Sequence, residues 1–152
     1  MPFKQLAASS GEMQKLIDHH PGNLNFTGLL ERSNVVPYFQ AADLFFLPSA
    51  QETFGIVIVE AAAAGLPVLL RDLQQYHETF GDNFVVGNDV TFTSIIHRFQ
   101  TDNDYYQMWK QKSKNIAERY DAPAGAQRLV EIYSDVLNRK AIKHNKKNGA
   151  RA

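Results

Sequence analysis

Apolar and polar residues along this chain alternate in blocks whose spacing predicts strands and helices in turn. In some blocks apolar residues recur every three or four positions, as in helices; in others they form short continuous runs, as in buried strands. This alternation, with short linkers, indicates an α/β fold in which helices flank a parallel sheet. Helices are predicted at 11–20, 35–42, 54–65, 91–99, 103–120 and 123–137, and strands at 23–28, 43–48, 67–70 and 83–86.

Two of the predicted strands differ in character. The run DLFFLP at 43–48 is continuously apolar and of strand length, which is typical of a strand buried on both faces. The stretch NLNFTG at 23–28 mixes polar and apolar residues and ends at a glycine turn. We expect both strands to belong to one sheet.

The segment 54–65 has two interpretations. Its residues 56–59 are β-branched and suit a strand. However, Glu60 and four alanines extend the run without a break, Gly65 and Pro67 supply a helix stop, and the whole run exceeds the usual length of a strand. We therefore predict a buried helix.

Composition narrows the class of protein. The chain has 152 residues, 44% of them hydrophobic, which is enough for the core of one domain. It has no cysteine, so disulfides, zinc–cysteine sites and thiol nucleophiles are excluded. No apolar run is long enough for a transmembrane helix, and Met1–Lys4 lead into no signal-peptide pattern. We expect a cytoplasmic protein.

The net charge of zero hides an asymmetry along the chain. All sixteen acidic residues lie at or before Asp135, whereas residues 139–152 carry six Lys and Arg and no acid. A basic end can contact anionic lipid; it can also be a solvated terminus, which Asn145, Asn148 and Gly149 favour. We predict a disordered basic tail at 139–152 after a domain at 1–138.

The segment 47–67, LPSAQETFGIVIVEAAAAGLP, carries the candidate chemistry. A strand ends at Pro48, a loop carries Glu52, and a helix starts near Gly55. Ligands of open α/β sheets bind beyond the carboxyl ends of the strands, and the first turn of a helix offers unpaired N–H groups suited to phosphate. Glu60 follows in an otherwise apolar run and needs donors, for which ribose hydroxyls are suitable.

Here the sequence resembles a known family. Glu52 and Glu60 fit E-x7-E within a longer frame, P-S-x-x-E-x-F-G-x-x-x-x-E-A-x-A-x-G-x-P-V. The frame is similar to the signature of retaining GT-B glycosyltransferases of family four, and the resemblance covers residues 23–87. It implies a Rossmann-like fold, the partial C-terminal, nucleotide-sugar-binding domain of a GT-B enzyme.

The resemblance assigns roles to individual positions. Glu52, the candidate catalytic residue, would accept hydrogen bonds from the hydroxyls of the donor hexose. The backbone at Thr53, Phe54 and Gly55 would contact the sugar and the phosphates.

The remaining donor-binding positions follow from the same resemblance. Ile56 and Val57 lie beside the phosphates on the first helical turn, and Glu60 would take the ribose hydroxyls. Leu29 or Leu30, after Gly28, would flank the base. No metal site is expected: His19, His20, His77 and His97 show no metal-like grouping.

The chain departs from the family after the third strand. Many members have a glycine-rich G-G-x-x-E loop there, whereas this chain has RDLQQYHE, with Glu78 the one matching acid. This variant resembles the branch of Gram-positive bacteria that glycosylates diacylglycerol. Arg71 and Asp72 at this edge either touch a ligand or form a structural ion pair.

The resemblance also implies an incomplete enzyme. The acceptor domain of a GT-B enzyme, and the strand followed by the Arg and Lys that neutralise the diphosphate, have no counterpart in these residues. Leaving-group electrostatics are the main catalytic device of such enzymes, so we expect no transfer by this chain alone. The family transfers sugar with retention, uses neither a metal nor a cofactor, and takes a nucleotide-sugar as substrate.

Several functions remain open at this point. The first is hexose transfer from a nucleotide-sugar, with UDP-glucose expected, to a lipid or glycan acceptor at the inner face of the membrane. The alternative is a non-catalytic remnant or interaction module that keeps the fold; a third is a nucleotide-sugar epimerase. Nucleic acid is not an expected partner, and self-association through an unpaired sheet edge is a further possibility.

Overall fold

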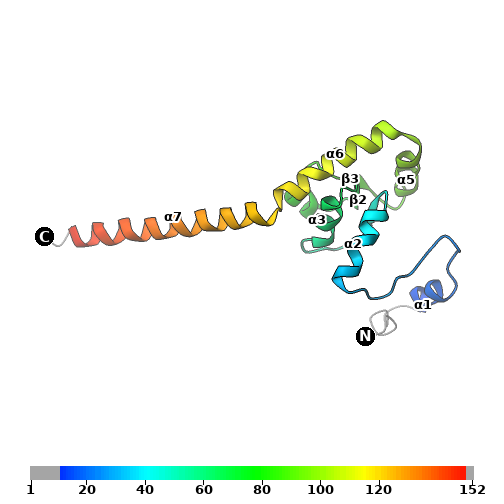
Figure 1. Ribbon diagram of the computed structural model, residues 1–152, viewed down its shortest axis with the longest axis horizontal. Helices are drawn as coiled ribbons and strands as arrows, with labels where there is room; N and C mark the ends of the chain where they lie inside the picture. The colour runs from blue at the N-terminus through cyan, green and yellow to red at the C-terminus, as the bar shows by residue number, and fades with distance from the viewer. Residues whose placement is uncertain (1–10, 150–152) are drawn as a thin grey trace. The chain divides into compact units, whose positions relative to one another are not determined.

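The chain divides after Ala41 into two units. A computed structural model describes the backbone of residues 11–149, and side chains within that range except those of 12–14, 16 and 141–149. Figure 1 shows the order of the elements along the chain.

The first unit contains two helices joined by irregular backbone. Helix α1 covers Gly11–Asp18 and α2 covers Arg32–Ala41, with Pro37 inside α2. The predicted strand at 23–28 is wrong, because no residue of this stretch is in a strand. A strand exists through backbone pairing with a neighbour, and the described residues of this unit contain no other extended segment to pair with. The predicted turn is present, since Gly28 has φ 68°.

The second unit is built on a parallel sheet of three strands in the order β1-β2-β3. β1 covers Phe45–Leu47, β2 Val68–Arg71 and β3 Val85–Gly87. Phe45 lies opposite Val68, and Leu69 lies opposite Val85. The strands predicted at 43–48, 67–70 and 83–86 are therefore present with shifted or shorter bounds.

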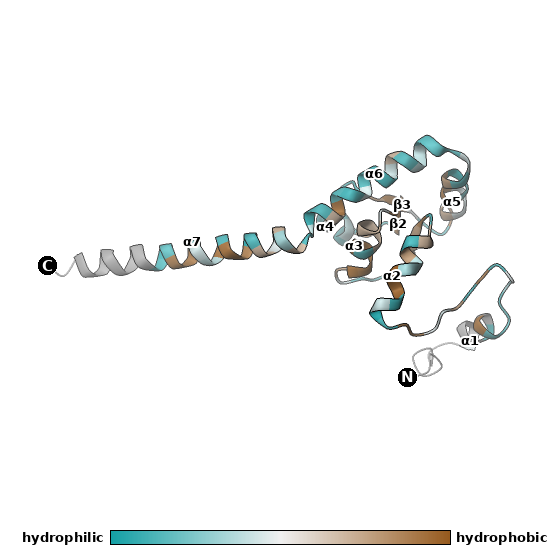
Figure 2. Ribbon diagram, in the orientation of Figure 1, coloured by the Kyte–Doolittle hydropathy of each residue, from teal (hydrophilic) through white to brown (hydrophobic). Residues whose placement is uncertain are grey.

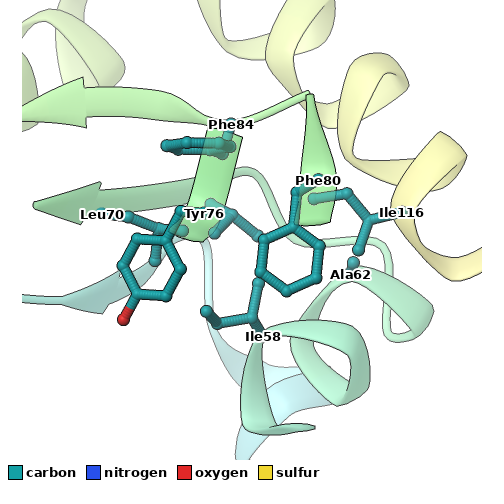
Figure 3. Packing of buried hydrophobic residues seen from close by; sticks show 8 residues of the cluster. Ile58, Ala62, Leu70, Tyr76, Phe80, Phe84 and Ile116 are labelled. Carbon is teal, nitrogen blue, oxygen red and sulfur yellow. The ribbon is translucent and has the colours of Figure 1, made fainter. Parts of the chain in front are cut away.

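Side chains of β2 alternate between the two faces of the sheet, as the strand geometry requires. Val68 and Leu70 join the larger core cluster, which is covered by α3 (Ile56–Ala63), α4 (Gln74–Phe80) and the C-terminal half of α6 (Asn103–Arg119). Figure 3 shows this cluster. Leu69 joins the other cluster with α5 (Phe92–Thr101) and the N-terminal half of α6.

The prediction that β1 is buried on both faces is wrong. β1 is half-buried, with Phe46 38% exposed. Within its unit this strand pairs with β2 alone, so it is an edge strand.

Helix α3 confirms the helical interpretation of the segment 54–65. Gly65 has φ 84°, and the N–H groups of Gly65 and Leu66 donate to the carbonyls of Ala62 and Ala61, which is the Schellman pattern of helix ends. The helix is buried on one face only, at Ile58, Ala61 and Ala62. Glu60 is half-buried, so the predicted burial of this helix applies to one face and not to the whole of it.

Helix α4 was not predicted, because residues 74–80 were interpreted as a loop that replaces the glycine-rich motif. It is anchored by Tyr76 and Phe80, which are both buried. Their spacing of four residues places them on one helical face. This spacing is the signal in the sequence that could have indicated the helix.

The C-terminal helix α7 covers Ala122–Gly149, beyond the end predicted at residue 137. Apolar and polar residues alternate along the part that is coloured in Figure 2. Its described apolar side chains are exposed: Leu129, Val130, Ile132, Tyr133, Val136 and Leu137. Among the described residues, no helix is both long enough and apolar enough to cross a bilayer.

Candidate functional site

The carboxyl ends of the three parallel strands lie at one edge of the sheet, which is the edge where open α/β sheets bind ligands. Arg71 ends β2 and links the other two strands there. Its Nε donates to the carbonyl of Pro48, just after β1, at 3.0 Å. Its two terminal nitrogens bind the carboxylate of Asp89, just after β3, at 3.1 and 2.6 Å. Arg71 therefore forms an ion pair with Asp89, while Asp72 pairs with His77; a ligand contact by either residue stays a prediction.

The Arg71–Asp89 pair also shifts the pKa values of both residues. The side-chain hydrogen bond from Arg71 lowers the pKa of Asp89 below its ordinary value, and the pKa of Arg71 is raised, first by the same bond. A carboxylate whose pKa is lower in the folded chain stabilises the fold above its unfolded pKa, and that contribution is lost as pH falls through the folded pKa.

Replacing Asp89 with asparagine is therefore expected to lower the melting temperature at neutral pH but less so in acid. The difference from the parent chain narrows as pH falls below the ordinary aspartate pKa of 3.8. Thermal unfolding followed by circular dichroism across this range measures it. Asp135→Asn on α7 is the control. If the melting temperature of Asp89→Asn differs from that of the parent chain by the same amount at every pH, the Arg71–Asp89 pair does not stabilise the fold in this way.

Glu52 lies in the loop between β1 and α3, and its position is fixed from two sides. Its Oε1 accepts a hydrogen bond from the backbone N–H of Thr53 at 2.9 Å. Its backbone carbonyl accepts a hydrogen bond from the side-chain amide of Gln75, in the first turn of α4. Glu52 is half-buried. It therefore lies in a loop that is held in place, and it is still partly accessible to solvent.

The start of α3 is not capped by a side chain. Gly55 is the N-cap residue, in the left-handed conformation with φ 73°, and no side chain caps the helix. The N–H of Ile58 donates to the carbonyl of Gly55 at 2.9 Å. The N–H groups of the first helical turn have no partner within an ideal helix, and together with the helix dipole they favour an anion.

Replacing Gly55 with alanine is expected to destabilise the fold by about 2 kcal/mol or more. A Cβ at this position would lie 2.6 Å from Cδ1 of Ile58, and the left-handed backbone adds strain. Chemical denaturation measures the effect. Gly125→Ala on helix α7 is the matched control, because a Cβ at that position meets nothing within 4 Å. Alanine is expected to stabilise the fold there. Equal effects at the two positions would contradict the explanation by steric contact and backbone strain at Gly55.

Glu60 is half-buried and lies on the side of α3 opposite Ile58. Ile56, which is 61% exposed, lies one turn before it on the same face. Ile58 lies on the opposite face, in the core. The carboxylate is therefore on the accessible side of the helix that begins at Gly55, about one and a half turns from its start.

Phe54 and Thr53 differ in what their side chains do. Phe54 is 40% exposed, and its ring contacts those of Tyr120 and Phe80 at centroid distances of 5.3 and 6.1 Å. The Phe54 side chain thus anchors the loop to the core. Thr53 is exposed. A ligand contact by the backbone of these residues stays a prediction.

The structure brings together the predicted positions of the 52–60 segment: Glu52, Thr53, Phe54, Gly55, Ile56, Val57 and Glu60. Leu29 and Leu30 belong to the first unit, where Leu29 is exposed and Leu30 half-buried. Their role beside the base stays a prediction. In the part of the chain that the structure describes, no three His, Asp or Glu side chains are grouped to hold a metal ion.

Two residues of α4 were missed by the sequence-based reasoning. Gln75 holds the backbone of Glu52, as described above. Tyr76 is buried, and its pKa is raised by burial and, to a smaller extent, by the negative charge of Glu52. The motif RDLQQYHE therefore contributes side chains beside the Glu52 loop, where many members of the resembled family have glycines.

Comparison with known proteins adds a second kind of observation. A family model described as "Glycosyl transferases group 1" matches residues 10–116. The chain is 30% identical over 128 residues to an alpha-galactosylglucosyldiacylglycerol synthase of Streptococcus pneumoniae, which covers 83% of this chain and 33% of that protein. It is 29% identical over 133 residues to a processive diacylglycerol alpha-glucosyltransferase of Acholeplasma laidlawii, covering 86% of this chain and 40% of that protein.

A third relative has a similar name and a similar coverage. An alpha-monoglucosyldiacylglycerol synthase of Acholeplasma laidlawii is 30% identical over 146 residues, which cover 89% of this chain and 35% of that protein. The chain therefore spans 33% to 40% of the length of these relatives.

Proposed function

Since this chain belongs to the glycosyl transferases group 1 family, we propose that it is the part of a glycosyltransferase that binds a nucleotide-sugar donor. The donor we expect is UDP-glucose. The acceptor we expect is a lipid or a glycan, and three relatives that are named as glycosyltransferases or synthases of glycosylated diacylglycerols support a lipid.

One arrangement supports the proposal above all others. Two carboxylates flank the uncapped start of α3 at the edge of the sheet where the strands end: Glu52 precedes it in a fixed loop, and the half-buried Glu60 follows on the side opposite Ile58. A nucleotide-sugar has the chemical groups that would bind to these two carboxylates and to the start of this helix. Its phosphates suit the helix N-terminus, and the hydroxyls at its two ends suit carboxylate acceptors.

Each group then has a task in transfer. Glu52 holds the hexose by its hydroxyls, the first turn of α3 receives the diphosphate, and Glu60 binds the ribose. The acceptor hydroxyl oxygen bonds to the anomeric carbon on the face from which the phosphate leaves, so the configuration is retained, and the departing phosphate takes the proton of that hydroxyl. Stabilising negative charge on that phosphate is the largest contribution that a protein makes to such a step.

Titration calorimetry of the purified chain with UDP-glucose and with UDP tests the donor site. We expect measurable binding of both, with UDP-glucose bound more tightly because Glu52 adds contacts to the hexose. Absence of binding at millimolar concentrations of both ligands would contradict the proposal. A parallel assay for sugar transfer to a diacylglycerol acceptor is expected to show none with this chain alone, and detectable transfer would refute that expectation.

The basic residues between 139 and 152 support peripheral contact with a membrane. Lys and Arg near an anionic surface contribute roughly 1 kcal/mol each. We expect the chain to co-sediment with vesicles that contain anionic lipid, and less so when salt is raised, because screening weakens this attraction. Equal sedimentation with neutral vesicles would contradict an electrostatic contact.

An interaction module is the second candidate, and the surface of α7 favours it. Six described apolar residues of this helix between Leu129 and Leu137 are 47% to 67% exposed. Apolar side chains gathered on one exposed element are typical of a protein contact. A chain that binds neither UDP nor UDP-glucose but self-associates in sedimentation experiments would support this function over donor binding.

A further inference from the structure

The packing of the core explains why the ring of Tyr76 is buried, but it does not explain why the hydroxyl is buried. The residue is 1% exposed, and its hydroxyl oxygen is buried without a hydrogen-bond partner among the described residues. A buried hydroxyl without a partner destabilises a fold, and the great majority of such groups are paired. Phenylalanine would fill the same space without this cost.

The ring of Tyr76 is packed as a core residue, but its hydroxyl is not part of the core. The ring lies among Ile58, Phe80 and Phe84. Figure 3 shows the hydroxyl directed away from Phe80 and Phe84. Ile58 is the residue whose side chain lies against Gly55 at the start of α3. The Tyr76 ring is therefore packed against the helix that begins at the candidate site.

Two further observations connect the first turn of α4 with Glu52. The preceding residue, Gln75, donates its side-chain amide to the backbone carbonyl of Glu52. The negative charge of Glu52 also contributes to the raised pKa of Tyr76, after the larger effect of burial. Gln75 thus holds the backbone of the Glu52 loop, and the neighbouring Tyr76 lies within reach of the electrostatic effect of Glu52.

We propose that Tyr76 is a positioning residue of the donor site, whose hydroxyl donates a hydrogen bond to the Glu52 carboxylate when a nucleotide-sugar binds. This inference rests on the proposed function. In the free chain the carboxylate accepts from the N–H of Thr53. In the complex, Tyr76 holds one carboxylate oxygen and leaves the other to accept from the hydroxyls of the hexose.

The proposal predicts opposite effects on stability and on binding. Tyr76→Phe removes an unpaired buried hydroxyl, so its melting temperature is expected to equal or exceed that of the parent chain. Its affinity for UDP-glucose in calorimetry is expected to fall about three- to tenfold, with little change for UDP, which lacks the hexose. A merely structural tyrosine would leave UDP-glucose binding unchanged, and that result overturns the proposal.

Tyr120→Phe is the matched control. The Tyr120 hydroxyl donates to the carbonyl of Thr79 at 3.0 Å, so removing it is expected to lower the melting temperature and leave the affinity for UDP-glucose unchanged. If Tyr120→Phe weakens binding as much as Tyr76→Phe does, the effect comes from the general packing of α4, and the proposal is wrong.

A double-mutant cycle shows whether Tyr76 acts through Glu52. The loss caused by Tyr76→Phe is expected to disappear in the Glu52→Gln background. A loss that persists there means that the hydroxyl touches the donor directly and overturns the positioning role.

An NMR measurement tests the proximity of Tyr76 and Glu52 without a donor. The chain is labelled at the tyrosine Cζ carbons, and the signal that disappears in Tyr76→Phe is the signal of Tyr76. Glu52→Gln is expected to shift this signal in the free chain, and no shift contradicts the proximity of the two groups. If the parent chain binds no UDP-glucose, the proposed function fails. The signal still decides whether Tyr76 and Glu52 interact.

Discussion

Replacing Phe80 with alanine is expected to lower the free energy of unfolding by about 3 to 5 kcal/mol, the usual cost of deleting a buried aromatic ring. Phe80 is 1% exposed and lies in the larger core cluster. Its ring contacts those of Tyr76, Tyr120 and Phe54 at centroid distances near 6 Å. Urea denaturation followed by far-UV circular dichroism measures the change.

The same substitution is expected to weaken the donor site. Phe54, in the loop that leads to α3, loses one of its two aromatic contacts when Phe80 is removed. Phe26→Ala in the first unit is the control with the same change of side chain. Phe26 is 37% exposed, so its replacement is expected to cost much less. Equal costs for the two substitutions would mean that Phe80 is not in the core.

Replacing Glu60 with alanine is expected to weaken the binding of UDP and of UDP-glucose at least tenfold. A carboxylate that accepts hydrogen bonds from ribose contributes about 1.5 to 3 kcal/mol, and tenfold corresponds to 1.4 kcal/mol. Both ligands contain the ribose, so both are affected alike. Calorimetry at constant pH and salt measures the two affinities.

The controls for Glu60 separate binding from folding. Glu131→Ala, on α7, removes an equal charge far along the chain from the segment 52–60 and is expected to leave both affinities unchanged. The melting temperature of Glu60→Ala is measured alongside, so that a loss of folded chain is not mistaken for the loss of the ribose contact. Affinities that are unchanged in Glu60→Ala would rule out the ribose contact.

The expected effects of Glu52, Glu60 and Tyr76 have different patterns. Glu60 acts on every ligand that contains the ribose, whereas Glu52 and Tyr76 act on the hexose alone. Comparing UDP with UDP-glucose in each variant therefore distinguishes the two ends of the site. This comparison needs no acceptor and no catalytic turnover, so it can be made with the chain as it is.

The sequence by itself determined the fold class, the family and the helix α3. The α/β alternation is present in the second unit, and the family predicted from the segment 47–67 is confirmed by the match to residues 10–116. These features were predictable because they depend on local signals: the length of the apolar run at 56–64, and the glycine and proline that end it.

Pairing and burial were decided only by the tertiary structure. The stretch 23–28 has the residues of a strand but pairs with no strand among the described residues, and the apolar β1 is an edge strand of the described sheet. Strand pairing joins residues distant in the chain, so composition alone cannot establish it.

The side chains that surround the candidate site could not be predicted from the sequence either. Arg71 could have bound a ligand, and its bidentate pair with Asp89 became evident only when β2 and β3 were placed side by side. Gln75 and Tyr76 were interpreted as part of a loop, and the fold places them beside Glu52, which lies more than twenty residues earlier. Residue types and short-range spacing indicate which chemistry a segment can perform. Which side chains meet there depends on long-range packing, and that information is in the folded structure.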